Sequence, residues 1–537
     1  MTARATSRVL PAGKVEISRS YSRVAGANIL VYTPKRRAPG AEGLMVVSMH
    51  GGLNPSLESP FLKAVAEYGV QTAFCVPDKS SFIDQFQSMN ACMALFRQMA
   101  GTVVLMGQSR GAALMSAYHA IAENGAKIFQ GPERYLPIPD MQVGAADGLM
   151  LLDANFGTTV MHLMSINPAW GDEADGYRVD PALDPLRPEN GYATDGNSAF
   201  SDDFKARFLR AQRARYYALL EQAQARWQAI QSGESAYRDN EPFIVPGAIG
   251  INNAPKLFAA DLRLLSRTES PWPLIHPDGT ITNQLVHSVR RDQNNPAFAG
   301  NLNSAFVTTV KDYLWTAVTV EESYDYGQDY LSGIDFGSSL TCSSGNVARI
   351  SCPLLLMGHT GGYEFIAAEW SYRRAASKDK SIAFLEGATH GWMPVDPAYG
   401  DTLGMSARFV VQWLTEAGRF AGGSAEAAPI NASRDEEAFD AGALRAALLG
   451  YWRGDGAMAH ARFEPGGNCE LGFASAWTQF EISKDGALHF HDRYGGTDTL
   501  SFTTDLRRAE SDRGVFHLED GVLCMHGVRL NRLPDKS

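Results

Sequence analysis

A serine lies between two glycines in the segment Gly107-Gln108-Ser109-Arg110-Gly111, which follows an apolar run and precedes a segment of helical periodicity. Glycines let a strand turn into a helix so sharply that the serine side chain projects from the turn. The free amides and the dipole of the following helix N-terminus favour a negative charge that develops beside Ser109. The pattern predicts a nucleophile at Ser109. The alternative is an ordinary strand–turn–helix connection that contains a serine.

Two histidines also follow apolar runs. His50-Gly51-Gly52 comes after residues 44–49, and His390 comes after residues 381–386, in the segment Gly-Ala-Thr-His-Gly-Trp. A histidine can take the proton of a serine hydroxyl, and backbone amides of a glycine turn can bind the oxygen that becomes negative when serine attacks a carbonyl. The alternatives are a histidine of the surface or core and a glycine turn that only makes room.

With these motifs the sequence resembles the α/β-hydrolase superfamily, particularly its esterases and lipases. The resemblance covers about residues 15–418, apart from a long block in the middle. It implies Ser109 as nucleophile and His390, on the loop after the last strand, as general base. It also implies that the amides of Gly51 or Gly52, with that of Arg110, form the oxyanion hole.

The acid of the expected triad is the point where the sequence departs from the superfamily. An aspartate usually follows the strand that here reads PLLLMGH, but residues 360–364 are Thr-Gly-Gly-Tyr-Glu. Glu364 is the nearest carboxylate and is our first choice. Asp153, at the end of the preceding predicted strand, is the alternative, since related enzymes can carry the acid there. Either carboxylate could instead have a structural role, such as capping a helix.

The elements around these residues alternate between apolar strands and amphipathic helices. Uniformly apolar runs typical of buried parallel strands occur at 44–52, 70–78, 102–109, 147–155, 352–362 and 381–387. Helical periodicity occurs at 81–100, 110–125, 364–377 and 402–418. Residues 14–22 and 27–34 look like an antiparallel pair at the start. We therefore expect an α/β-hydrolase fold with a mostly parallel sheet.

The remaining segments predict additional units. Residues 1–155 and 347–420 would form the two parts of the hydrolase core, and residues 156–346 a large, mainly helical cap over the ligand-binding edge of the sheet. Residues 421–435 have linker composition. Two Asp-Gly pairs within alternating patterns predict hairpins, so residues 436–537 should form a small antiparallel β module.

Composition narrows the classes of partner. The chain is 45% hydrophobic and 20% charged, and its net charge of −11 argues against a nucleic-acid or anionic membrane partner. The six cysteines show no metal-ligand spacing, and we expect free thiols in the cytoplasm, with no metal and no other cofactor. We expect no signal peptide, since the first residues lack a continuous apolar stretch, and no membrane-spanning helix. Whether the chain forms a homo-oligomer stays open.

The function predicted from these residues is hydrolysis of a small-molecule carboxylic ester through an acyl-enzyme. The alternatives are amide or C–C bond hydrolysis or acyl transfer with the same triad, or an inactive hydrolase fold that serves as a binding protein. Within the central block, Arg290 and Arg291 could bind a substrate carboxylate, although exposed charges of a solvated helix are the plainer interpretation.

Overall fold

The computed structural model describes most of the chain. The described residues are 7–24, 26–50, 58–170, 179–193, 198–247, 256–291, 305–420, 441–453, 460–471, 477–482, 487–492, 497–502, 508–511, 514–519, 522–525 and 528–533. Within these ranges, no helix combines the length and the apolar character needed to cross a membrane.

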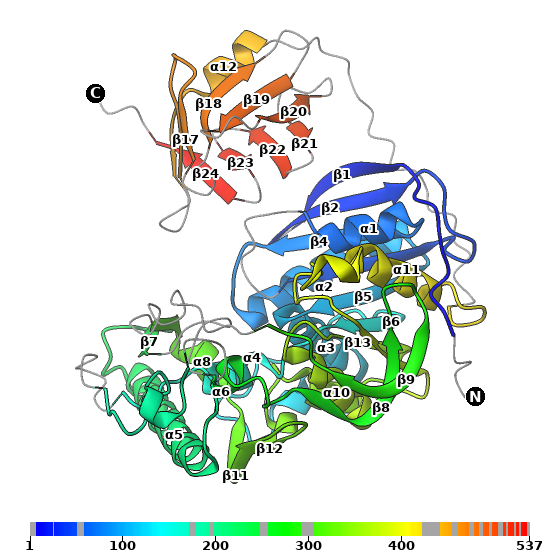
Figure 1. The fold of residues 1–537 in the computed structure, drawn as a ribbon. Coiled ribbons are helices and arrows are strands. Elements are labelled where there is room, and N and C mark those ends of the chain that lie inside the picture. The colour runs from blue at the N-terminus through cyan, green and yellow to red at the C-terminus, as the bar shows by residue number, and fades with distance from the viewer. Residues whose placement is uncertain are drawn as a thin grey trace.

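A ten-stranded sheet forms the centre of the molecule (Figure 1). Its seven central strands are parallel; two strands joined by antiparallel pairing extend it at one edge, and one antiparallel strand extends it at the other. In spatial order the strands are β1 (Ile17–Val24), β2 (Ala27–Pro34), β4 (Gln71–Pro77), β3 (Leu44–Met49), β5 (Thr102–Gln108), β6 (Gly148–Leu152), β13 (Leu354–His359), β14 (Lys380–Leu385), β8 (Arg267–Ile275) and β9 (Ile281–His287). The leading antiparallel pair and the parallel strands predicted from the sequence are confirmed.

Helices cover both faces of this sheet. Alternate residues of a strand point to opposite faces, so Ile29 and Val31 of β2 join one core while Leu30 and Tyr32 join the other. The helices on the first face are α2 (Phe82–Met99), α3 (Arg110–Asn124) and α10 (Ala367–Arg374), and those on the second are α1 (Pro60–Glu67) and α11 (Thr402–Leu414). The fold is therefore a three-layer α/β/α arrangement.

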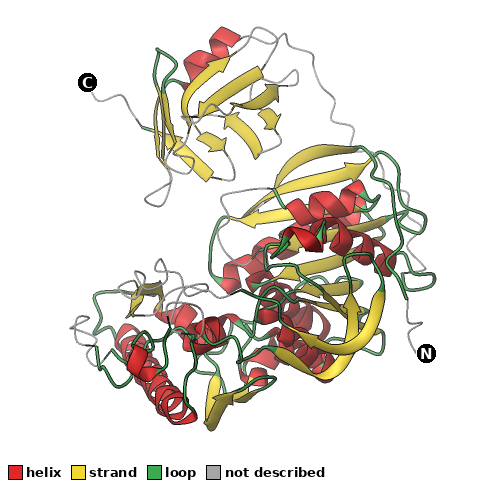
Figure 2. Ribbon diagram, in the orientation of Figure 1, coloured by secondary structure: helices red, strands yellow, loops and turns green. Residues whose placement is uncertain are grey.

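The central block, residues 156–346, contains a long helix and several short elements (Figure 2). Ser201 caps the long helix α5 (Asp202–Ser232) by accepting a hydrogen bond from the amide of Phe204. The block also contains α4 (Thr158–Leu163), α6 (Leu257–Ala260), α8 (Val310–Thr316), α9 (Ser343–Asn346), and the strand pairs β7 (Pro242–Pro246) with β10 (Ala305–Thr309) and β11 (Thr319–Tyr326) with β12 (Leu331–Asp335). Short 3-10 turns occur both in the central block and outside it. They lie at Ala126–Phe129, Pro188–Asn190, Phe336–Ser338, Val347–Arg349, Glu364–Ile366 and Pro397–Tyr399.

The sequence predicted that residues 156–346 form one continuous insertion, but part of this block belongs to the main sheet. Its strands β8 and β9 extend the main sheet beyond β14, and β8 pairs with β14 through residues Leu274 and Ile275. These strands did not look like buried parallel strands because β8 is only partly buried and contains two prolines. The boundary between core and insertion therefore falls within residues 156–346, and strands as well as helices make up the block.

The C-terminal residues form a second sheet with its own core. Its strands are antiparallel, in the spatial order β17 (Cys469–Leu471), β16 (His460–Phe463), β15 (Gly450–Arg453), β24 (Val528–Arg532), β23 (Val522–Met525), β22 (Gly514–Glu519), β21 (Arg508–Ser511), β20 (Thr497–Phe502), β19 (Ala487–Asp492) and β18 (Trp477–Ile482). A bridge between Asn468 and Gln479 brings the first and last strands together. Helix α12 (Ala441–Leu448) buries Leu444 and Leu448 against this sheet. The predicted antiparallel module is confirmed, whereas the predicted linker lies outside the described residues.

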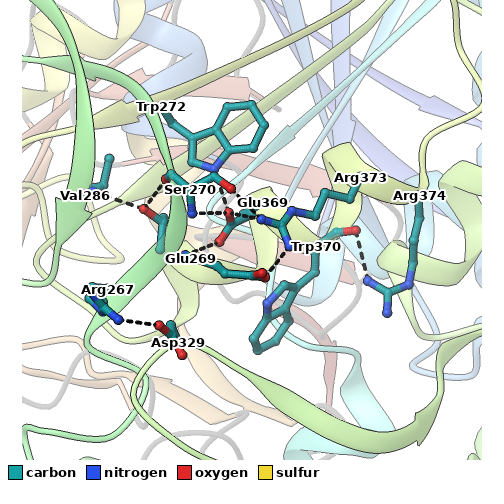
Figure 3. Close-up of polar contacts among 11 residues, drawn as sticks. Arg267, Glu269, Ser270, Trp272, Val286, Asp329, Glu369, Trp370, Arg373 and Arg374 are labelled. Atoms are coloured by element: carbon teal, nitrogen blue, oxygen red, sulfur yellow. Dashed lines mark hydrogen bonds and ion pairs between the residues drawn. The ribbon is translucent and has the colours of Figure 1, made fainter.

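A buried carboxylate joins α10 to the outer part of the sheet (Figure 3). Glu369 has no exposed surface and accepts hydrogen bonds from the backbone amides of Glu269 and Ser270, at 2.9 and 3.0 Å, where the β8–β9 register shifts. It also accepts the indole N–H of Trp272 at 2.8 Å and a guanidinium N–H of Arg373 at 3.0 Å. Loss of this carboxylate would leave several buried donors without an acceptor.

We expect Glu369→Ala to lower the free energy of unfolding by about 3 kcal/mol, because a buried charge network loses its central acceptor. Chemical denaturation measures this value. Glu269→Ala is the matched control, since the Glu269 side chain is 61% exposed and should contribute less than about 0.5 kcal/mol. Equal effects of the two substitutions would contradict the structural role of Glu369.

Candidate active site

Ser109 lies at a strained turn between β5 and α3. Its φ of 54° and ψ of −126° belong to a region that residues other than glycine rarely adopt. A Cβ atom at Gly107 would lie 2.5 Å from the Cα of Ala112, and one at Gly111 would lie 3.2 Å from the carbonyl oxygen of Met49. The two glycines therefore let the helix start close to β5 and to the end of β3, which fixes Ser109 at the carboxyl edge of the sheet.

His390 lies on the loop after β14, at the same edge of the sheet. Its Nδ1 donates a hydrogen bond of 2.6 Å to Oδ2 of Asp153 and lies 2.7 Å from Oε2 of Glu364. The imidazole is 34% exposed, while the side chains of Asp153 and Glu364 are 0% and 7% exposed. One ring nitrogen of His390 is thus held between two buried carboxylates, which leaves Nε2 as the nitrogen that can exchange a proton with a substrate or a nucleophile.

Asp153 connects the elements of the site through both its backbone and its side chain. It directly follows β6, with a φ of 45°, and its N–H donates to Met357 O at 2.7 Å. Its carbonyl oxygen accepts the N–H of Ser109 at 3.3 Å, and Oδ1 accepts the N–H of His359 at 2.8 Å. Asp153 therefore contacts the turn that carries Ser109, the neighbouring strand β13 and the imidazole of His390 at once.

These contacts shift the proton affinities of the site. Burial alone would lower the pKa of His390, but the charges of Glu364 and Asp153 outweigh it and hold that pKa well above its usual value. Burial alone would raise the pKa of Asp153, but His359 and His390 outweigh it and the net shift is downward. The geometry thus favours an ionised Asp153 and stabilises the imidazolium form of His390.

Three further residues with basic side chains interact electrostatically with residues of the site or with one another. Burial lowers the pKa of His50 to about 4, and the charges of Arg110 and His390 lower it further. Burial, with the charges of Arg110 and Lys256, lowers the pKa of His162 to about 3. Burial also lowers the pKa of Lys256 to about 8, although the nearby charge of Glu364 acts in the opposite direction. His50 and His162 are therefore neutral imidazoles at neutral pH.

The guanidinium of Arg110, the first residue of α3, contacts the start of α2. Its guanidinium donates to the carbonyl oxygen of Ser80 at 3.0 Å and lies over the ring of Phe82 at 4.8 Å. Burial lowers its pKa to about 10, and the charge of Asp312 opposes this effect. The backbone amide of Arg110 belongs to the first turn of α3, where amides have no partner within the helix.

The structure brings together Ser109, His390, Asp153 and Glu364, all of which were selected from the sequence. Gly51 and Gly52 lie outside the described residues, but His50, which precedes them, borders the nucleophile turn through Gly111. Both carboxylates that were considered as alternatives contact the same histidine nitrogen.

Arg290 does not have either role that the sequence suggested. It is buried, and its guanidinium donates to the carbonyl oxygens of Phe258, Asp261, Leu264 and Leu265. An arginine with its donors used in this way fastens a loop of the central block and is neither a solvated surface charge nor a substrate ligand.

Sequence reasoning missed three residues of the site. Gln108 lies inside the serine motif, and its side-chain amide donates to the carbonyl oxygen of His390 at 2.5 Å. His359 ends β13, so a polar residue at the end of an apolar strand was the available signal. Lys256 carries no local signal, because only the folding of the central block places it beside Glu364.

Among the described residues, the site itself is one of two groups whose atoms could face a metal ion: Asp153, Glu364 and His390. The nitrogen–oxygen distances of 2.6 and 2.7 Å are hydrogen-bond distances. An ion bound by all three groups would have to push them apart and displace the proton on Nδ1. We therefore interpret the three groups as partners in proton sharing.

The second group, His119, Glu123 and Cys352, is explained by hydrogen bonding. Glu123 accepts the amides of Ser351 and Cys352 at 2.8 and 3.3 Å, and Nε2 of His119 lies 2.9 Å from its Oε1. Nδ1 of His119 accepts an amide N–H from Ala146 at 3.5 Å, so the ring proton is on Nε2. A protonated nitrogen is not a metal ligand, and the cluster instead connects the end of α3 to the segment before β13.

No family model matches the sequence, and no curated protein matches it. Three of the solved structures that resemble it are esterase E25 (12% identity, 74% of this chain and 77% of that chain covered, TM-score 0.32), proline iminopeptidase of Mycobacterium smegmatis (10%, 74% and 97%, 0.30) and a monoacylglycerol lipase of Paleococcus ferrophilus (13%, 75% and 99%, 0.30). At such low identities and TM-scores these likenesses carry no argument about activity.

The sheet and the nucleophile turn of this chain themselves define the fold. The molecule has an α/β-hydrolase fold: a mostly parallel sheet covered on both faces by helices, with a serine at a strained strand-to-helix turn. The carboxylates and the histidine follow in the chain order that this fold requires. The fold predicted from the sequence is confirmed.

We expect Glu364→Gln to lower the pKa of His390, because the substitution removes a negative charge 2.7 Å from Nδ1. An NMR titration of the His390 ring proton, assigned with His390→Gln, measures the shift. Glu386→Gln is the matched control, since the carboxylate of Glu386 contacts His276 instead, at 2.7 Å. An unchanged or higher pKa in Glu364→Gln would contradict the electrostatic role of Glu364.

Proposed function

We propose that the protein is a serine hydrolase that cleaves a small-molecule carboxylic ester through an acyl-enzyme intermediate. Ser109 is the nucleophile, His390 the general base and then the general acid, and Asp153 the acid that orients His390. The observation that carries the proposal is the position of Ser109: a strained serine at a strand-to-helix turn, next to a residue whose side chain binds the loop of His390.

The proposed reaction uses the free nitrogen of His390 twice. Nε2 removes the proton of the Ser109 hydroxyl as its oxygen attacks the ester carbonyl, and Asp153 stabilises the imidazolium that forms. The tetrahedral intermediate collapses, the carbon–oxygen bond of the alcohol breaks, and the imidazolium returns the proton to the leaving alcohol. Water then attacks the acyl-enzyme with the same assistance, which releases the carboxylic acid and regenerates Ser109. The sequence of steps requires no cofactor.

The oxygen that becomes negative needs hydrogen-bond donors in both steps. We assign this role to the amide of Arg110, which is at the N-terminus of α3, together with an amide of Gly51 or Gly52. Three observations support the assignment: α3 begins at Arg110, its dipole favours negative charge at this end, and His50 borders the turn. The neutral state of His50 keeps a second cation away from His390.

Asp153 is the better choice for the triad acid, although the sequence favoured Glu364. Asp153 receives the hydrogen bond from Nδ1 and is fixed by the bond from its own amide to Met357 O and by bonds from the amides of Ser109 and His359. Glu364 makes a close ionic contact with the same nitrogen, and its charge also acts on Lys256. We therefore assign orientation of the imidazole to Asp153 and an additional electrostatic effect to Glu364.

Ser109→Ala should remove the activity toward a short p-nitrophenyl ester, with kcat lowered by roughly 10⁴ to 10⁶, because no other group can form the acyl-enzyme. A fluorophosphonate probe should label the wild-type protein at Ser109 and leave the variant unlabelled. Circular dichroism shows whether the variant is folded. Wild-type activity in a folded variant would contradict the assignment of the nucleophile, and a folded wild-type protein that resists the probe would favour a binding function.

Asp153→Asn should lower kcat by about 10⁴, because an amide cannot stabilise the imidazolium and favours the wrong tautomer. Glu364→Gln should cause a smaller loss when both variants are measured at alkaline pH, where His390 is neutral in each. Steady-state kinetics of the two matched amide substitutions, with melting temperatures recorded alongside, decide between the carboxylates. A larger loss in Glu364→Gln would assign the triad acid to Glu364.

A further inference from the structure

Side chains at the ends of three neighbouring strands of the main sheet contact Thr389 and His390. Strands β5, β6 and β13 lie side by side, and Gln108 and His359 are the last residues of β5 and β13, while Asp153 directly follows β6. Each of these three side chains contacts a different atom of the two-residue segment. A segment that follows β14 is therefore fixed against strands that precede it in the chain.

Gln108 makes the first of these contacts. Its side-chain amide nitrogen donates to the carbonyl oxygen of His390 at 2.5 Å. Because the partner is a carbonyl oxygen, the amide must present its N–H group. Gln108 is bonded directly to Ser109, so this hydrogen bond links the backbone of the nucleophile to the backbone of the base across 282 positions of sequence. A shift of the Ser109 turn relative to the His390 loop would stretch or break this hydrogen bond.

His359 makes the contact on the opposite side of β6. Its ring has no exposed surface, and Nδ1 lies 3.1 Å from the carbonyl oxygen of Thr389, so Nδ1 carries the ring proton. The backbone N–H of the same residue donates to Oδ1 of Asp153, and Nδ1 lies 3.8 Å from Oδ2 of Asp153. His359 thus touches both the acid and the segment that carries the base.

Other contacts hold the rest of the loop, and backbone hydrogen bonds within the loop also bind Thr389. Trp392, with a φ of 62°, stacks on Phe61 at 4.8 Å between ring centroids, and the hydroxyl of Thr402 donates to its carbonyl oxygen at 2.5 Å. The amide of Trp392 donates to Thr389 O at 3.0 Å. The position of His390 therefore depends on its contacts with Gln108, Asp153 and Glu364. His359 adds a contact to Thr389, beside the backbone bonds within the loop.

We infer that Gln108 and His359 are positioning residues of the hydrolase site, which together hold the backbone of Thr389–His390 so that the imidazole keeps its contact with Asp153 at the edge of the sheet that carries Ser109. This inference rests on the proposed function. Neither side chain takes part in proton transfer. Both act on the geometry of the base, and misplacement of a reacting group by about 1 Å can cost about a hundredfold in rate.

Gln108→Met removes the donor while keeping a side chain of similar length. Because Gln108 is only partly buried, the substitution leaves the core intact. We expect kcat for a p-nitrophenyl ester to fall by about 10- to 100-fold with KM changed by less than about twofold, and the rate of fluorophosphonate labelling to fall by a similar factor. The control is Gln130→Met, since the Gln130 amide also donates to a carbonyl oxygen, that of Ile138 at 3.0 Å, on a different loop.

For His359, two substitutions separate the loss of its hydrogen-bond donor from a change in packing. His359→Leu removes the N–H group that faces Thr389 O, whereas His359→Asn keeps a side-chain N–H near the place of Nδ1. We expect kcat to fall in the leucine variant and to recover most of its value in the asparagine variant, with melting temperatures recorded for both. An asparagine variant no faster than the leucine variant would overturn the role of His359.

Labelling of the wild-type protein distinguishes failure of this inference from failure of the proposed function. If the wild-type protein is not labelled at Ser109, the proposed function fails and the inference fails with it. If the wild-type protein is labelled and Gln108→Met is labelled as fast as Gln130→Met, only the inference is overturned. A slower rate confined to Gln108→Met, with KM unchanged, supports it.

Discussion

A buried carboxylate, that of Asp153, must remain paired for the site to keep its shape. An unpaired charge in a protein interior is costly, so the groups around Asp153 are constrained to present hydrogen-bond donors to it. His390 and His359 supply two of these donors, and the backbone of Asp153 is bonded to β13 and to Ser109. The requirement to pair one carboxylate thus brings the nucleophile turn, the neighbouring strand and the histidine loop to one edge of the sheet.

The second carboxylate, that of Glu364, adds to the effect of Asp153 on the pKa of His390. With Asp153 alone, Nδ1 of His390 would meet one negative charge. Glu364 adds another at 2.7 Å, and its charge also acts on Lys256 of the central block, where it opposes the effect of burial on the pKa of that lysine. The carboxylate that contacts His390 therefore also interacts with a residue of the central block.

Several features of the site could be predicted from the sequence because they depend on local patterns. Glycines at positions 107 and 111 are required by close contacts of the turn, and apolar runs around them identify buried strands. Chain order, the glycine after it and the resemblance to the superfamily together selected His390, on the loop that follows β14. The serine motif needs only a few consecutive residues, so Ser109 could be chosen as a candidate from the sequence alone.

Other features depend on contacts between residues far apart in the chain, and no local pattern contains them. Nothing near Asp153 or Glu364 indicates that both reach the same nitrogen, and nothing near Arg290 indicates that it binds four carbonyl groups. Strand β8 was missed because its burial is partial and its prolines are unusual in a strand. The sequence therefore indicated the type of site and the order of its parts, whereas the partners of each side chain required the folded structure.

The most direct test of the account is a crystal structure of the protein after reaction with a phosphonate that modifies serine. The account predicts a phosphorus–oxygen bond to Ser109, with Nε2 of His390 within hydrogen-bond distance of the adduct and Nδ1 still bonded to Asp153. It also predicts that the phosphoryl oxygen faces the amide of Arg110 and an amide of Gly51 or Gly52. An adduct on another residue, or a His390 ring turned away from Asp153 and Ser109, would contradict it.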